Sequence, residues 1–97
     1  MDINRAFGEA LKLARKAANM SQEQLAEDMD MQQSALSRLE RGVNSPTLDR
    51  IAELADALHT TPSVLLAQAQ DILAFADTID KGKKPGRAKK SKPRTTR

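Results

Sequence analysis

The sequence contains no cysteine, which excludes a disulfide framework and a zinc site built from thiolates. Tryptophan and tyrosine are also absent, so the only aromatic side chains are those of Phe7 and Phe75. A hydrophobic core must therefore be built from Leu, Ile, Ala, Met and Val. Because these 97 residues are rich in Ala and Leu and contain only four Gly, they predict one small, all-α domain.

Long hydrophobic runs are absent as well. No stretch approaches the roughly 20 apolar residues that a membrane-spanning helix needs, and no charged and then apolar leader opens the chain. We therefore expect a cytoplasmic protein with no membrane partner. The sequence also lacks a nucleophile paired with a base, a cluster of metal ligands and a Gly-rich phosphate loop. We accordingly expect neither an enzyme nor a protein that needs a cofactor or a metal.

Positive charge is scarce in most of the chain and concentrated at its end. Residues 1–80 contain seven Lys and Arg against thirteen Asp and Glu, a net charge of −6, whereas residues 81–97 contain nine Lys and Arg and no acid, a net charge of +9. A nucleic-acid-binding domain is usually basic. The acidic body therefore argues against DNA binding unless its cations gather locally.

The basic tail, residues 81–97, shows no helical periodicity and has Ala88 as its only apolar side chain. It cannot bury enough surface to offset the entropy of ordering, so we expect it to be disordered when free. It could serve solubility, or it could bind RNA, an anionic membrane surface or an acidic protein. The charge density favours an arm that contacts DNA phosphates without sequence preference, through Lys83, Lys84, Arg87, Lys89 and Lys90.

Apolar residues recur at helical spacing in five segments. They predict helices at about residues 3–18, 22–29, 33–41, 48–58 and 62–78. Ser21 and Gln24 have the spacing of a capping box. Further expected signals are N-caps at Thr47 and at either Thr61 or Ser63, left-handed backbone at Asp30, and a C-cap at Gly42. Core positions expected late in the chain are Leu48, Ile51, Ala52, Leu54, Ala55, Leu58, Leu65 and Leu66.

Residues 22–41 predict two helices joined by a three-residue turn. Ala26 is small enough for the two helices to cross closely, and Met31 can fill the corner between them. Leu36 and Leu39 would seat the second helix on the first. The outward residues of the second helix are then Gln, Ser and Arg, the types that hydrogen-bond to base edges in the major groove of DNA. They are Gln33, Ser34, Ser37 and Arg38.

This pattern resembles the helix-turn-helix of the Cro/C1-type (XRE-like) regulators, the family of phage repressors and their bacterial relatives. The resemblance covers roughly residues 5–67. It rests on "LARKAANMSQEQLAE", "MQQSALSRLERG", "SPTLDRIAELADAL" and "TPSVLL", which follow one another in the family's order. It implies an all-α, five-helix lambda-repressor-like DNA-binding domain over residues 1–67, with a helix-turn-helix and a disordered basic C-terminal tail.

The resemblance also implies roles for individual residues. Helix 33–41 would lie in the major groove, with Gln33, Ser34, Ser37 and Arg38 facing bases; the alternative for these four is a solvated helix face. Arg15 and Glu40 occupy positions that form a partly buried ion pair in several members of the family. Contacts to DNA phosphates would come from Gln22, Gln32, Arg41, Asn44 and Ser45.

Residues 68–80 predict an extension of the fifth helix. Leu65, Ala69, Ile72, Ala76 and Ile79 recur at alternating steps of four and three, which is typical of a helical seam. The seam could pack on the core or against a second copy of the chain. The second possibility is favoured because a dimer can read two half-sites on DNA. Its expected contacts are Ile72, Leu73, Phe75, Ala76 and Ile79.

Taken together, these features predict a homodimeric, sequence-specific DNA-binding transcriptional regulator. We expect a repressor that is associated with the nucleoid when bound to double-stranded DNA. The alternative is an antitoxin or adaptor, a module that binds a toxin or another regulator through residues 65–79 and for which DNA binding is secondary.

Overall fold

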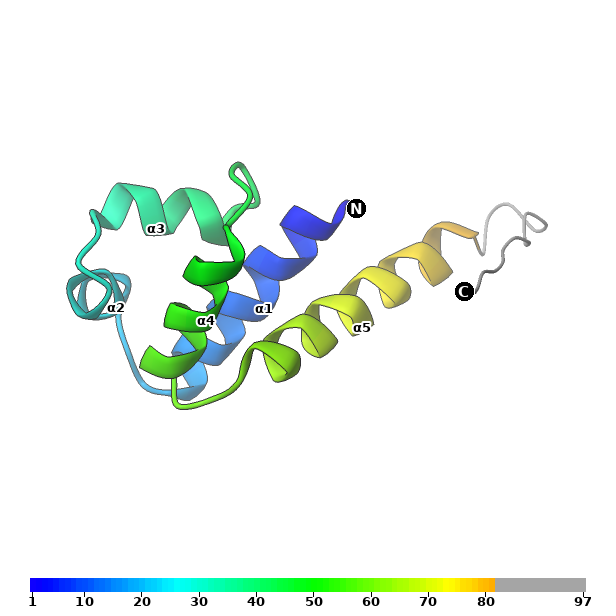
Figure 1. Cartoon of the computed structure of the whole chain (residues 1–97). Helices are drawn as coiled ribbons and strands as arrows, with labels where there is room; N and C mark the ends of the chain where they lie inside the picture. Colours follow the sequence, from blue (N-terminus) through cyan, green and yellow to red (C-terminus); the bar gives the residue numbers. More distant parts are fainter. Residues whose placement is uncertain (82–97) are drawn as a thin grey trace.

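The structure is a computed structural model that describes residues 1–81, with side chains described through Thr78. Five α-helices and no strand occur in this range (Figure 1), which confirms the predicted all-α class. The helices are α1 (Ile3–Ala17), α2 (Gln22–Asp28), α3 (Gln33–Glu40), α4 (Leu48–Ala57) and α5 (Pro62–Lys81). The predicted disorder and DNA contacts of the tail, and the predicted contact of Ile79, lie outside the described residues.

Local sequence signals explain where the helices begin. Ser21 accepts from the backbone N–H of Gln24, whose side chain in turn accepts from the N–H of Ser21, so the predicted capping box is present. Thr47 caps α4 by accepting from the N–H of Arg50 at 3.0 Å. For α5 the cap is Thr61, whose hydroxyl accepts from the N–H of Val64 at 3.3 Å.

The first four helices all end in the same way, with one left-handed residue directly after the C-cap. The backbone φ angles of these residues are 60° at Asn19, 54° at Asp30, 78° at Gly42 and 60° at His59. In each case the next N–H bonds to a carbonyl five residues back, as in Met20 to Arg15 O at 3.1 Å. This is the Schellman arrangement. It turns the chain sharply and brings the next helix back onto the core.

One leucine from each helix forms the centre of the core. These side chains are fully buried: Leu11, Leu25, Leu36, Leu54 and Leu65. For two residues of α4 the prediction of burial in the core was wrong. Leu48 is 80% exposed because it is the first residue of the helix, and Ala52 lies on the solvent face. Leu66 was also wrong as a core residue, since it is 39% exposed.

Two glycines let α1 approach the end of α3. A Cβ atom on Gly8 would lie 2.4 Å from the carbonyl oxygen of Glu40, and a Cβ on Gly42 would lie 2.6 Å from the Cα of Arg5. Real Cβ atoms do not approach so closely, so any other residue would push the helices apart. The role of Gly8 is not evident from the sequence, because a single glycine in a helical pattern does not indicate which segment packs against it.

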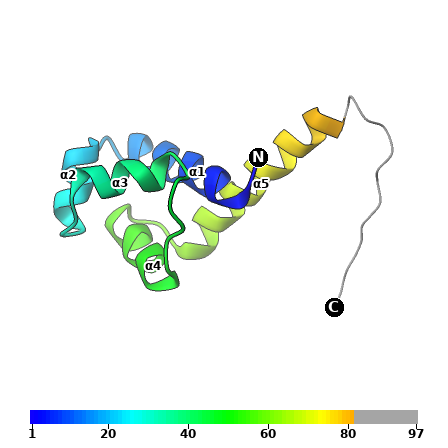
Figure 2. The ribbon, with the colours of Figure 1, turned by 90° about the horizontal axis from the view of Figure 1, so that it is seen from above.

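Helices α1 and α5 run in opposite directions and pack along much of their length (Figures 1 and 2). The last turns of α5 extend beyond the rest of the fold. Ile72 and Leu73 are half-buried against the core of their own chain, whereas Phe75 is 68% exposed. Over residues 1–81, none of the helices has the length and apolar character that a membrane crossing requires.

Candidate nucleic-acid interface

Helices α2 and α3 form a tight elbow at one end of the molecule (Figure 1). Leu25 and Ala26 of α2 and Leu36 and Leu39 of α3 are buried, and Met31 in the turn is half-buried against them. Helix α3 ends at Glu40, one residue earlier than expected. The elbow leaves the outer face of α3 open to solvent. Gln33, Ser34 and Arg38 are exposed there, and Ser37 is half-buried.

A buried ion pair ties α3 to α1. Arg15 Nε donates to Glu40 Oε2 at 2.6 Å, and Arg15 Nη2 donates to Glu40 Oε1 at 3.2 Å. The side chains are only 9% and 4% exposed. Arg15 Nη1 also donates to the carbonyl oxygen of Met20 at 2.8 Å, just before α2 begins. One guanidinium therefore joins α1, the start of α2 and the end of α3.

The ion pair continues as a hydrogen-bonded chain to the start of α3. Gln22 Nε2 donates to Glu40 Oε1 at 3.0 Å, and Gln33 Nε2 donates to Gln22 Oε1 at 3.3 Å. Gln33 is thus held from behind at the first residue of α3. A side-chain amide carries two donor hydrogens, so Gln22 and Gln33 each retain one Nε2 hydrogen for another partner.

The expected phosphate contacts other than Gln22 lie at the two ends of α3. Gln32 is the N-cap residue, but its side chain makes no capping bond and is exposed. Arg41 follows the helix, and its Nε donates to Ser37 Oγ at 3.4 Å. Asn44 and Ser45 are exposed in the loop before α4. These polar groups therefore flank the exposed face of α3 at its two ends.

Comparison with known proteins agrees with this geometry. The family description "Helix-turn-helix" matches residues 11–65. The control protein C.BamHI of Bacillus amyloliquefaciens is 36% identical over 66 residues, which are 67% of this chain and 82% of that protein. The chain belongs to the helix-turn-helix family.

Solved structures show the same architecture. The clp gene regulator ClgR from Corynebacterium glutamicum superimposes with a TM-score of 0.77 at 25% identity, covering 86% of this chain and 89% of that one. The restriction-modification controller protein C.AhdI from Aeromonas hydrophila gives a TM-score of 0.61 at 36% identity, covering 63% of this chain and 92% of that one. Helix-turn-helix proteins of this family are DNA-binding transcriptional regulators and not enzymes, and this chain is one of them.

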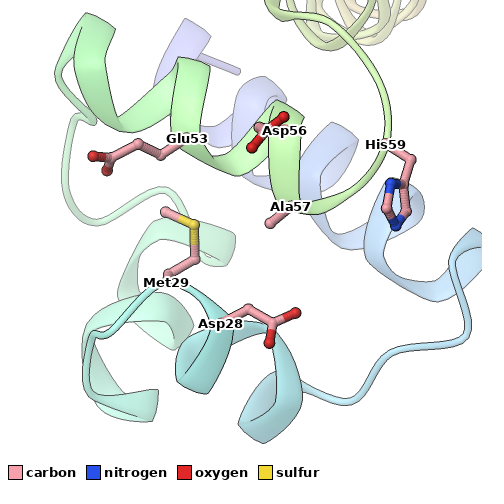
Figure 3. Close-up of a pocket in the computed structure, with 6 residues that line it drawn as sticks. All are labelled: Asp28, Met29, Glu53, Asp56, Ala57 and His59. Carbon is pink, nitrogen blue, oxygen red and sulfur yellow. The ribbon is translucent and has the colours of Figure 1, made fainter.

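A crevice between α2 and α4 is lined by acidic side chains and lies away from the outer face of α3. Figure 3 shows Asp28 from the end of α2 and Glu53 and Asp56 from α4, with Met29 and Ala57 between them and His59 at the rim. The Glu53 carboxylate points away from Asp28. Within residues 1–81, no group of three or more acidic, His or Cys side chains is placed to hold a metal. His59 instead serves as the left-handed residue that ends α4.

Proposed function

We propose that this helix-turn-helix protein is a homodimeric repressor that reads a specific DNA sequence with α3. One observation carries the proposal: α3 presents an exposed polar face whose first residue, Gln33, is braced through Gln22 to the buried Arg15–Glu40 pair. Precise base readout requires side chains that are already positioned before DNA arrives. A merely solvated helix face would need no such support from the core.

The residue types on this face fit base recognition. An amide such as that of Gln33 can pair with the N6 and N7 groups of adenine, and a guanidinium such as that of Arg38 can pair with O6 and N7 of guanine. Arg38 makes no ion pair with any residue of the described range, so its donors are available to DNA. Ser34 and Ser37 can donate to or accept from either kind of base.

The surface proposed for a second copy of the chain is an exposed apolar strip along α1 and α5. It is formed by Leu13, Ala17, Val64 and Phe75. Phe75 lies eleven residues after Val64, about three helical turns, so the two share one face of α5. Val64 lines a shallow groove with Ala17 of α1, and Leu13, one turn before Ala17, is 59% exposed. Burial of this apolar strip in a dimer would place two copies of α3 on two half-sites.

Occupation of a promoter is the simplest regulatory consequence of such binding. A dimer that covers two half-sites excludes other proteins from the same DNA, and this needs no further chemistry. Of the similar structures named above, one is described as a clp gene regulator and the other as a restriction-modification controller protein. Their descriptions support regulation of transcription by this chain, and repression by occlusion is the form of it that we propose.

The test is selection of bound fragments from random DNA with the full chain, at a salt concentration that suppresses non-specific attraction. We expect enrichment of two inverted half-sites about 10 base pairs apart. Arg38→Ala should weaken binding to the selected site by roughly 1–3 kcal/mol and relax the preference at one base position per half-site.

The control is Arg50→Ala, which removes a half-buried arginine of α4 that is paired with Glu53. It should leave the selected sequence unchanged. If the folded wild-type chain enriches no sequence, α3 does not read bases by itself, and a protein-binding adaptor becomes the better description.

A further inference from the structure

Most of the few cations of the acidic body belong to α1, to α3 or to the residue directly after α3. Of the seven Lys and Arg in residues 1–80, two are paired with carboxylates in the structure, Arg15 with Glu40 and Arg50 with Glu53. The other five lie on α1, on α3 or directly after α3. They are Arg5, Lys12, Lys16, Arg38 and Arg41.

Three of these cations surround an open groove between α1 and α3. Arg5 and Lys12 stand on the α1 side, and Arg41 stands on the α3 side. Close backbone packing joins the two sides, since Gly42 leaves no room for a Cβ against Arg5. Ser37 lines the same groove and accepts the Nε hydrogen bond of Arg41. The guanidinium of Arg41 is therefore held toward the edge that the groove shares with the outer face of α3.

The groove is positively charged although the body is not. The two carboxylates that line it are Glu9 and Glu40. The charge of Glu40 is balanced by Arg15 at 2.6 Å, which leaves three cations against the single carboxylate of Glu9. The remaining acidic residues of the body lie elsewhere, including those of the crevice between α2 and α4.

We propose that this groove binds the DNA backbone that borders the major groove, and that Arg5 and Lys12 of α1 are phosphate contacts. The proposal rests on the proposed function, because it takes α3 as the reading helix and adds the strand beside it. A polyanion fits better than a small anion: the cations stand on two helices around an open groove, and the groove is continuous with the base-facing side through Ser37 and Arg41.

This assignment explains how an acidic body can approach DNA. The long-range field of residues 1–80 is repulsive, but attraction at contact depends on the charges nearest the phosphates. In the sequence, Arg5 and Lys12 look like isolated charges on the solvent side of a helix. Only the packing of α1 across the end of α3 places them beside Arg41.

The experiment measures the dissociation constant of the full chain on duplex DNA over a range of salt concentrations. Each phosphate contact contributes about −0.9 to the slope of log K against log salt. We expect Arg5→Gln with Lys12→Gln to make the slope shallower by about 2, on the selected site and on a scrambled duplex alike. The selected base sequence should not change.

The control is Arg50→Gln, which removes a positive charge of α4 outside the groove. A charge-preserving variant, Arg5→Lys with Lys12→Arg, should keep most of the wild-type slope and shows whether the glutamine pair acts through charge. Thermal unfolding followed by circular dichroism verifies that all variants are folded.

An unchanged slope in the glutamine pair overturns the groove assignment, and so does a drop of about 0.9 in the Arg50→Gln control, which would show that the slope responds to any lost charge. The two proposals fail in different ways. If the wild-type chain binds every duplex equally, sequence readout by α3 fails, but the comparison of slopes on any duplex still decides whether the groove contacts phosphates. If the wild-type chain binds no duplex, both proposals are wrong.

Discussion

Arg15 is the residue on which the geometry of the interface depends most directly. Its guanidinium makes three hydrogen bonds, two to Glu40 and one to the carbonyl of Met20, and so joins three segments of the chain. Burial of two charges is costly, and their attraction repays that cost only when the remaining donors and acceptors are satisfied. Here Gln22 donates a further hydrogen bond to Glu40 Oε1 and accepts one from Gln33.

Removal of one partner of the buried Arg15–Glu40 pair should destabilise the fold far more than removal of one partner of an exposed ion pair. We expect Glu40→Ala to lower the free energy of unfolding by about 3–5 kcal/mol, because it leaves the Arg15 charge buried without a partner. Urea unfolding followed by circular dichroism measures the change. Glu53→Ala is the control, since it breaks the exposed pair with Arg50 and should cost less than about 1 kcal/mol. Similar losses for the two variants would contradict a structural role for the buried pair.

At the scale of single elements, α5 departs most from what its sequence suggested. In the repeat of Leu65, Ala69, Ile72 and Ala76, Leu65 is expected in the core and is fully buried there, as is Ala69. Ile72 and Leu73 are expected at a dimer contact, but they are half-buried against the core of their own chain. Periodicity shows that a helix has an apolar face but not which surface covers that face. The most exposed large apolar side chain of α5 in the described range is that of Phe75, at 68%, which lies at one side of this repeat.

Phe75 therefore gives the sharpest test of the proposed dimer. Burial of a phenylalanine side chain contributes about 1.5–3 kcal/mol, so we expect Phe75→Ser to raise the dissociation constant of the dimer at least tenfold. Sedimentation equilibrium measures this constant. Leu66→Ser is the matched control, because Leu66 is also an exposed apolar residue of α5 but projects from the opposite side of the helix. A wild-type chain that is monomeric at micromolar concentration would refute the dimer on this face.

At the scale of the whole molecule, the separation of charge is the dominant feature. The body carries −6 and the basic tail carries +9, and within the body the free cations stand near α3. In the proposed complex, the cations of the body that line the groove between α1 and α3 attract DNA phosphates, while the acidic residues of the body repel them. Such an arrangement favours DNA that approaches α3 in the correct orientation.

The contribution of the tail can be measured by deletion of residues 82–97, which removes eight Lys and Arg. Each phosphate contact that the deletion removes lowers the dependence of affinity on salt. The shortened chain should therefore show a clearly shallower slope of log K against log salt. The sequence selected from random DNA should be the same for both chains. An unchanged slope would show that the tail does not contact DNA and would leave it a role in solubility.

The amino-acid sequence by itself determined the class, the number of helices and most of their ends. These depend on local interactions, namely the capping box at Ser21, the cap at Thr47, a cap at either Thr61 or Ser63, the left-handed Asp30 and Gly42, and the 3.6-residue spacing of apolar side chains. The structure decides for Thr61. The spacing also identified the elbow of α2 and α3 and the four candidate residues on its outer face. Each of these signals lies within a few residues of the feature that it predicts.

Only the tertiary structure decided which surfaces meet. The close approach of α1 to α3 at Gly8, the hydrogen bond of Gln22 to Glu40, and the grouping of Arg5 and Lys12 with Arg41 all join residues far apart in the sequence. The Arg15–Glu40 pair, by contrast, is implied by the family resemblance and is present. The same is true of Leu48 and Leu66, whose apolar character predicted burial that the packing does not provide. Helical periodicity defines the faces of each helix, but the packing of all five helices decides which faces are covered.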